Sequence, residues 1–236
     1  MIDIRNVSVF GWQQAIHGMR NSWNSWEKSD TTYKPDGSID ILGKNDYELM
    51  KKLTSAHPSH AKFRRMITVY CNITAPLYWW KEFDTYKVGT VSNSMSTMHT
   101  IMKKEFESDD FSHEHLLKIK DNVPAAISVS GEKCYYSPEG FLKMTCEMLN
   151  AYRGSYLKEK DLELKKKYWW QIIQLLPSSY NQTRTVMLNY EVLANIYQNR
   201  KGHPLDEWGK FLEWIEGLQW ANPFITGKEL EGHCGG

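Results

Sequence analysis

Residues 63–76 read FRRMITVYCNITAP, and this stretch decides which fold class the chain can adopt. Apolar residues occupy every second position from Ile67 to Ile73. A period of two is typical of a β-strand that buries one face better than the other. Pro76 is expected to end the strand, because proline has no N–H to donate to a neighbouring strand. The sequence therefore predicts a strand inside an otherwise helical chain.

Helical patterns surround this strand. Residues 10–20 (FGWQQAIHGMR) are expected to form a helix with Arg20 at its end, and residues 45–56 (NDYELMKKLTSA) form another, with Asn45 or Asp46 as N-cap. The other expected helices cover residues 76–87, 95–106, 138–154 (after Ser137 as N-cap), 155–177, 183–202 and a last segment from Pro204. The predicted fold class is α+β with helix predominating.

The composition argues against several classes of function. The 236 residues carry 29 Lys and Arg against 28 Asp and Glu, so no excess charge drives binding to nucleic acid or acidic membranes, although a local basic pocket stays compatible. Neither a long apolar run nor a signal-peptide pattern occurs. The four cysteines form no CxxC pair, as a zinc site or disulfide framework would suggest. We expect one cytoplasmic domain over residues 1–236, with a frayed tail from about residue 228.

Familiar catalytic motifs are absent. The chain contains no GxGxxG, GxxxxGK[ST], HExxH or GxSxG pattern, which removes the common dinucleotide, nucleoside triphosphatase and hydrolase interpretations. His57 and His60 could supply two metal ligands from one loop, but no third ligand is identifiable, so we expect no metal. Arg64 and Arg65 begin the strand, where adjacent side chains point to opposite faces. At most one of them is expected to enter a given pocket, and a solvated charge explains either one equally well.

Two polar segments remain as candidate sites. Arg20 lies in MRNSWNSW among small hydrogen-bonding residues and tryptophans, a combination that binds an anion and stacks a base, although such tryptophans are usually core residues. Residues 93–99 read NSMSTMH. On a helix, Ser92, Ser96 and His99 would share one face, yet serine and histidine without an orienting acid make no catalytic triad. A polar helix start with buried methionines explains the composition as well.

Several stretches, in order, resemble the flavin-dependent thymidylate synthase family, ThyX. They are MRNSW, NDYELMKKL, HPSH, Phe63, ITAP, the segment ending NSMSTMH, and LPSSYNQTRTVMLNYEVLANIYQNR. The resemblance covers most of residues 4–208. It implies a helix-rich α+β fold around a central, mostly antiparallel sheet. It also implies a homotetramer whose sites are completed by neighbouring subunits.

The resemblance carries over to individual positions unevenly. The positions that match the family's motifs are Arg20, Ser22, Asn93, Ser96, Asn189, Leu193 and Arg200. Lys87 keeps the positive charge of a signature arginine. The departures are Ser94 for a glutamate, Met98 for an arginine, His99 for a tyrosine and Glu191 for a nucleotide-binding arginine. Losing a bidentate phosphate donor and reversing a charge each weaken a site for a dianionic ligand.

The resemblance implies two alternative functions. In the first, the chain is a divergent thymidylate synthase that methylates a dUMP-like pyrimidine nucleotide with reduced FAD and methylenetetrahydrofolate. In the second, it has lost this activity and senses or sequesters a nucleotide. The residues expected at the flavin are Lys87, Arg200, Asn189 and His60. Those expected at the nucleotide are Arg20, Ser22, Ser94, Ser96, His99 and Glu191, with Ser96 and Asn93 as the expected catalytic residues.

Overall fold

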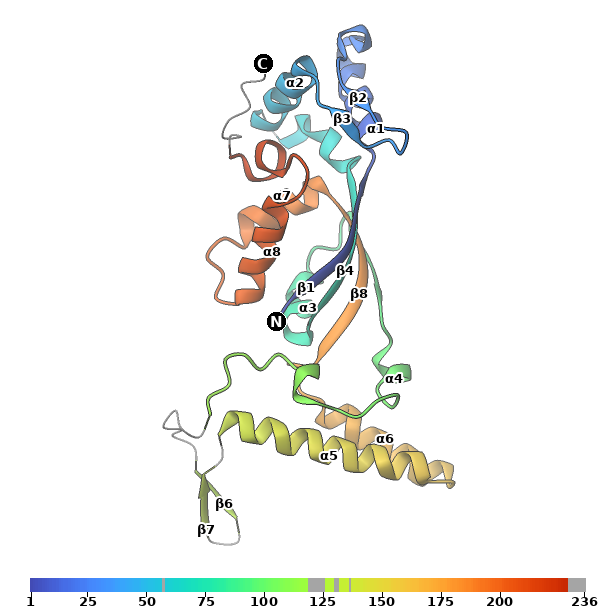
Figure 1. The fold of residues 1–236 in the computed structure, drawn as a ribbon, viewed down its shortest axis with the longest axis vertical. Helices are drawn as coiled ribbons and strands as arrows, with labels where there is room; N and C mark the ends of the chain where they lie inside the picture. Colours follow the sequence, from blue (N-terminus) through green and yellow to red (C-terminus); the bar gives the residue numbers. More distant parts are fainter. Residues whose placement is uncertain (57, 119–125, 130–131, 136, 229–236) are drawn as a thin grey trace. The chain divides into compact units, whose positions relative to one another are not determined.

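The computed structural model describes residues 1–56, 58–118, 126–129, 132–135 and 137–228 (Figure 1). The chain divides into two compact units. Unit 1 comprises Met1, Thr74–Lys81 and Met95–Thr183, and unit 2 comprises Ile2–Ile73, Glu82–Ser94 and the chain from Arg184 onward. The tail expected to fray lies beyond residue 228, outside the described residues. A single domain over residues 1–236 stays a prediction.

A four-stranded sheet contains the strand predicted from the alternating sequence. Its order is β1 (Asp3–Phe10), β4 (Thr68–Pro76), β8 (Asn181–Asn189) and β5 (Val91–Ser94) (Figure 1). β4 ends at Pro76 as predicted, and Val69, Cys71 and Ile73 are buried along it. β5 lies antiparallel to β8. The predicted α+β class, helix-rich around a central antiparallel sheet, is confirmed.

β8 corrects one prediction. Residues 183–202 do not form a single helix, because they divide between β8 and α7 (Tyr190–Asn199). Val186 and Leu188 are buried two positions apart, which is the period of a strand. Asn189 then caps α7, since its Oδ1 accepts a hydrogen bond from the backbone N–H three residues later (3.0 Å). The change from strand to helix therefore falls inside the segment that the sequence pattern assigned to one helix.

Unit 2 packs its helices around aromatic side chains. Trp12, Tyr190 and Phe211 are fully buried, and the rings of Trp12 and Tyr190 meet edge to face at 5.3 Å. The helix ending at Arg20 is confirmed, but the N-cap of α2 is Gly43 and not Asn45 or Asp46. The remaining elements of unit 2 are α1 (Trp12–Arg20), η1 (Asn21–Trp23), η2 (Trp26–Lys28), β2 (Thr32–Tyr33), β3 (Ile39–Ile41), α2 (Lys44–Ser55), η3 (Pro58–His60), η4 (Lys62–Arg65), α8 (Asp206–Glu216) and the π-helical turn η7 (Asn222–Thr226).

Unit 1 is built on two helices that pack against each other, α5 (Pro138–Lys158) and α6 (Leu162–Leu175). Phe111, Leu149 and Ile172 belong to its buried apolar core. Its other elements are α4 (Thr97–Thr100), η5 (Ser108–Asp110), β6 (Ala126–Val129) and β7 (Glu132–Tyr135), while α3 (Leu77–Phe83) is shared between the two units. In the part of the chain that the structure describes, no helix is both long and apolar enough to cross a membrane.

The caps of α5 and α6 confirm one prediction and correct another. Ser137 caps α5 as predicted, because its Oγ accepts a hydrogen bond from the backbone N–H of Gly140 (3.0 Å). The helix expected over residues 155–177 is wrong, since the chain leaves α5 at Lys158 and starts again at α6. Asp161 caps α6 by accepting a hydrogen bond from a backbone N–H three residues later (2.8 Å).

Candidate anion-binding cavity

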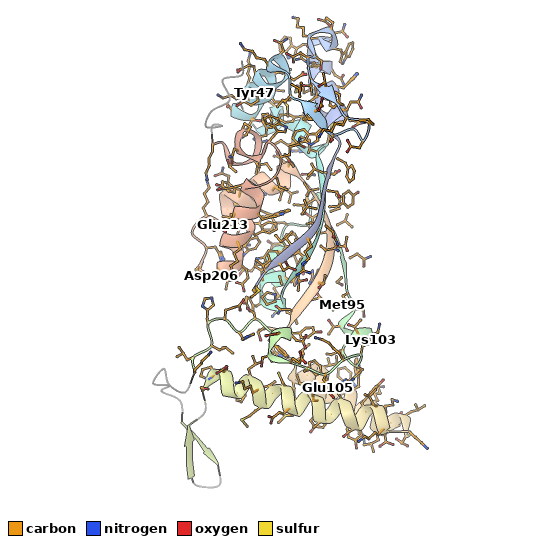
Figure 2. All side chains as sticks on the ribbon, viewed as in Figure 1. Tyr47, Met95, Lys103, Glu105, Asp206 and Glu213 are labelled. Carbon is orange, nitrogen blue, oxygen red and sulfur yellow. The ribbon has the colours of Figure 1, made fainter. Side chains whose placement is uncertain are left out.

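A cavity of about 870 Å³ lies in unit 2. Its walls come from α2, η4, the turn that precedes β5, one side of α7, and the residues around η7. Tyr47, labelled on α2 in Figure 2, is one of its lining residues. A volume of this size is within the range of small-molecule and cofactor sites. We call it the basic cavity, because more cationic than anionic side chains are found among its described lining residues.

Cations outnumber anions in the basic cavity. Among the described residues, its lining contains Lys51, Arg64, Arg65 and Lys228 and one carboxylate, Glu191. Lys228 also contacts a carboxylate that does not line the cavity. Arg65 is exposed and has no ion-pair or hydrogen-bond partner among the described residues. Its guanidinium group is thus available to an anion, and its planar fork of donors matches a phosphate or carboxylate.

Arg64 and Glu191 contact each other within the cavity. The Arg64 Nη1 and the Glu191 Oε2 are 3.5 Å apart, which is longer than a strong charge-assisted hydrogen bond of about 2.7–2.9 Å. The Arg64 Nε is buried and has no hydrogen-bond partner within the described structure. Burial lowers the pKa of the Arg64 guanidinium, and the Glu191 carboxylate opposes that shift. Part of the donor fork of Arg64 is therefore left without an acceptor.

Both arginines reach one cavity because they do not lie on a strand. The prediction placed Arg64 and Arg65 at the start of β4, where adjacent side chains would point to opposite faces. They lie instead at the end of η4, a 3₁₀ helix, and both line the basic cavity. The prediction that at most one of them enters a given pocket is wrong.

A polar stripe on α7 forms another wall. Glu191, Asn195 and Gln198 follow one another at intervals of four and three residues, which places them on one helix face, and Asn189 lines the cavity at the N-cap. Asn189 and Glu191 are the sequence-predicted site residues that the structure brings together here. The lining residues that sequence reasoning missed include Tyr47, Lys51, Asn195 and Gln198. Polar residues three and four positions apart on two helices were an available signal.

Arg200 and Lys87, expected at the flavin, do not line this cavity. The Arg200 Nη1 lies 3.0 Å from the Glu82 Oε2, and its Nε donates to the Tyr86 Oη at 2.9 Å. Its guanidinium also lies over the Trp208 ring, 4.5 Å from the centroid. Arg200 is thus engaged inside the protein. Lys87 is exposed and directly precedes two residues that line the basic cavity.

Arg20 is also engaged inside the protein. Its Nε donates to the Asp46 Oδ1 at 2.7 Å, and the two side chains are only 4% and 0% exposed. Burial alone would raise the pKa of Asp46, but hydrogen bonds from Thr31, Arg20 and Ser29 hold that pKa below its usual value. Neither Arg20 nor the exposed Ser22 lines the basic cavity. The structure therefore places Arg20 in a buried ion pair.

The NSMSTMH segment is not one helix. Asn93 and Ser94 are exposed residues of β5, and Ser96 is the N-cap residue of the short helix α4. The predicted helical face shared by Ser92, Ser96 and His99 is wrong, because Ser92 belongs to the strand. The His99 side chain lies outside what the structure describes.

The described residues offer neither a cluster of metal ligands nor an activated cysteine at Cys71. Among the described residues, no group of three His, Cys, Asp or Glu side chains could hold a metal ion. His60 is exposed and does not line the basic cavity, and His57 lies outside the described residues. Burial raises the pKa of the Cys71 thiol to about 12. Because the thiolate is the reactive form, Cys71 is not poised as a nucleophile near neutral pH.

The structure is an α+β protein with a basic cavity, and comparisons with solved structures identify the kind of fold. The chain is similar to the structure of thymidylate synthase X (ThyX) from Helicobacter pylori with FAD and dUMP, with a TM-score of 0.62 and 16% identity over 96% of this chain and 97% of that one. A second structure, flavin-dependent thymidylate synthase ThyX from Helicobacter pylori complexed with FAD and dUMP, gives a TM-score of 0.56 and 17% identity over 94% and 98%.

No protein-family model matches the chain, and a search of curated proteins finds no match. At 16–17% identity the likeness shows the fold alone. The chain therefore has a ThyX-like fold, as its sequence motifs predicted.

Proposed function

We propose that this chain is a nucleotide-binding protein whose basic cavity holds the phosphate of FAD or of a pyrimidine nucleotide. The observation that carries the proposal is the lining of the cavity, where the described residues include four cations and one carboxylate. The whole chain has a formal net charge of only +1, so this positive charge is a local feature. Guanidinium and ammonium groups that converge on a pocket are the usual partners of phosphate.

The residues present fit such a phosphate. Arg65 is exposed and has no partner among the described residues, and Lys51 lines the same cavity. Asn195 and Gln198 add neutral donors and acceptors that suit the hydroxyl and carbonyl groups of a nucleotide. FAD, when bound, would supply hydride-transfer chemistry. The role of this chain's own residues would be to bind and orient the phosphate. Arg65 would take the part expected of Arg200, because Arg200 is already paired with Glu82 and Tyr86.

A second candidate function is the methylation of a dUMP-like nucleotide with FAD and methylenetetrahydrofolate. The two Helicobacter pylori structures favour it, because their ligands are FAD and dUMP. Ser96 and Asn93 stay predictions as catalytic residues of this reaction. A homotetramer and a cytoplasmic location belong to the same proposal.

Binding is tested by titrating the purified chain with FAD and with dUMP in a calorimeter. Replacing Arg65 by Ala should weaken binding by about 1.5–3 kcal/mol, the scale of a charged hydrogen bond. Arg5→Ala is the matched control, because Arg5 is an exposed arginine that does not line the cavity. Equal affinities in the wild type and the Arg65→Ala variant would remove Arg65 from the site. A wild type that binds neither ligand would overturn the proposal.

Catalysis is tested separately, by supplying dUMP, methylenetetrahydrofolate, FAD and a nicotinamide reductant and measuring thymidylate. Product formation above that of the Arg65→Ala variant would support the enzyme. Nucleotide binding without any product under these conditions would leave the binding protein as the function.

A further inference from the structure

Glu191 stands out as the carboxylate among the described lining residues of the basic cavity. It lies in the first turn of α7, where the helix dipole stabilises a negative charge without help from a partner. Its side chain is 25% exposed, so its carboxylate also stays in contact with water. The Glu191 carboxylate is therefore within reach of Arg64, of the cavity and of solvent.

The pairing itself is loose. The 3.5 Å contact between the Glu191 Oε2 and the Arg64 Nη1 is long, and the buried Arg64 Nε has no acceptor. An unpaired buried donor is unfavourable, so an arriving anion that takes both donors of the fork would improve on the present arrangement. Such an anion would have to displace Glu191 and then tolerate a negative charge close by.

We propose that Glu191 is a specificity-determining residue that competes with the ligand for Arg64 and so makes the cavity disfavour a dianionic phosphate. This inference rests on the proposed function of the basic cavity as a phosphate site. Repulsion from the displaced carboxylate grows with the charge of the ligand, so a terminal monophosphate loses more than a phosphate with one negative charge. The favoured ligand class is a phosphodiester, whose phosphate carries a single negative charge, rather than a nucleoside monophosphate.

The test compares the wild type with Glu191→Gln, which keeps the side-chain shape and removes the charge. At pH 8 dUMP is dianionic, since a phosphate monoester loses its second proton near pH 6, and deoxyuridine has the same base and sugar without charge. Calorimetry should show that the variant binds dUMP about tenfold or more tightly than the wild type does. The affinity for deoxyuridine should stay equal in the two proteins.

Two further variants isolate the mechanism. Glu163→Gln makes the same change of net charge in the first turn of α6, at an exposed residue that does not line the cavity, and should leave dUMP binding unchanged. In an Arg64→Gln background, the gain from Glu191→Gln should disappear, because a double-mutant cycle reports the coupling between the two residues.

Each outcome decides the inference. Unchanged dUMP affinity in Glu191→Gln, an equal gain for deoxyuridine, an equal gain in Glu163→Gln, or a gain that persists without Arg64 would overturn it. If the wild type binds no nucleotide but Glu191→Gln binds dUMP, the proposed function fails and the role of Glu191 stands; if neither binds, both fail. Should circular dichroism show that Glu191→Gln is unfolded, Glu191→Ser serves for the same titrations.

Discussion

Asp46 illustrates at the scale of one residue how a partner distant in sequence decides a role. Arg20 was correctly predicted at the end of a helix, but nothing near it in the chain identifies the carboxylate 26 residues later that takes its charge. Asp46 was predicted as an N-cap and is instead fully buried against Arg20. A local sequence pattern predicts the position of a residue in a helix, and only the tertiary structure shows which side chains it contacts.

Asp46→Asn should destabilise unit 2. Removing one partner of a buried ion pair leaves the other charge uncompensated, which costs about 3–5 kcal/mol. Urea unfolding followed by circular dichroism at pH 7 measures the change in the free energy of unfolding. Asp40→Asn, at an exposed aspartate of β3, should change it by no more than about 0.5 kcal/mol. Equal stabilities of the two variants would show that the buried pair contributes nothing.

The same variant gives a prediction for pH. The pKa of Asp46 in the folded protein lies below the usual 3.8, so its stabilising contribution is complete above pH 3.8 and is lost as the pH falls through the lower folded value. The stability difference between the wild type and Asp46→Asn should therefore be constant from pH 7 to pH 5 and narrow below pH 3.8. Urea titrations at several pH values measure it, and a difference that widens in acid would contradict the sign.

Cys71 should resist alkylation in the folded protein. Cys71 is 1% exposed, and burial raises the pKa of its thiol to about 12, so little thiolate forms at pH 8. Mass spectrometry after treatment with iodoacetamide should find the Cys71 peptide unlabelled in buffer and labelled in urea. Labelling in buffer at the rate seen in urea would mean that β4 opens readily.

At the scale of elements, β4, the last residue of α1 and the start of α5 follow from the sequence, because each has a local signal such as an alternation, a proline or a cap. β8 did not, because its sequence NQTRTVMLN does not alternate apolar and polar residues and continues directly into the helical pattern of α7. The break between α5 and α6 was expected after residue 154 and lies instead between Lys158 and Leu162, because the cap at Asp161 stands within a continuous run of helix-forming residues. Strong helical periodicity hides short interruptions.

The turn before β5 offers a prediction with a matched control. Gly89 and Gly37 have nearly the same left-handed φ, +80° and +81°. A Cβ at Gly89 would lie 3.0 Å from the Asn189 Nδ2, whereas one at Gly37 meets nothing within 4 Å. Gly37→Ala should cost about 1–2 kcal/mol of stability from backbone strain alone, and Gly89→Ala should cost more. Thermal and urea unfolding compare the two, and an equal cost would show that Asn189 moves aside freely.

At the scale of the whole molecule, the near-neutral composition conceals a local concentration of charge. The basic cavity brings Lys51, Arg64 and Arg65, which lie close together in the sequence, to Lys228 near the other end of the chain. The composition was compatible with a local basic pocket, but the sequence does not show that residues 51–65 meet Lys228 and the polar face of α7. The strength of the site therefore depends on how unit 2 assembles and not on the net charge of +1.

Ligand binding should protect unit 2 selectively, and hydrogen exchange followed by mass spectrometry measures this. A ligand at 100 times its Kd stabilises the bound state by about 2.7 kcal/mol, which slows exchange roughly 100-fold for amides that exchange only when the site opens. With FAD or dUMP, protection should rise in peptides from α2, η4 and α7, which line the basic cavity. Peptides from α5 and α6, which contribute no described lining residue, serve as the internal reference. Protection confined to α5 and α6 would place the ligand elsewhere, whereas protection of α2, η4 and α7 that is lost in Arg65→Ala would assign it to the cavity.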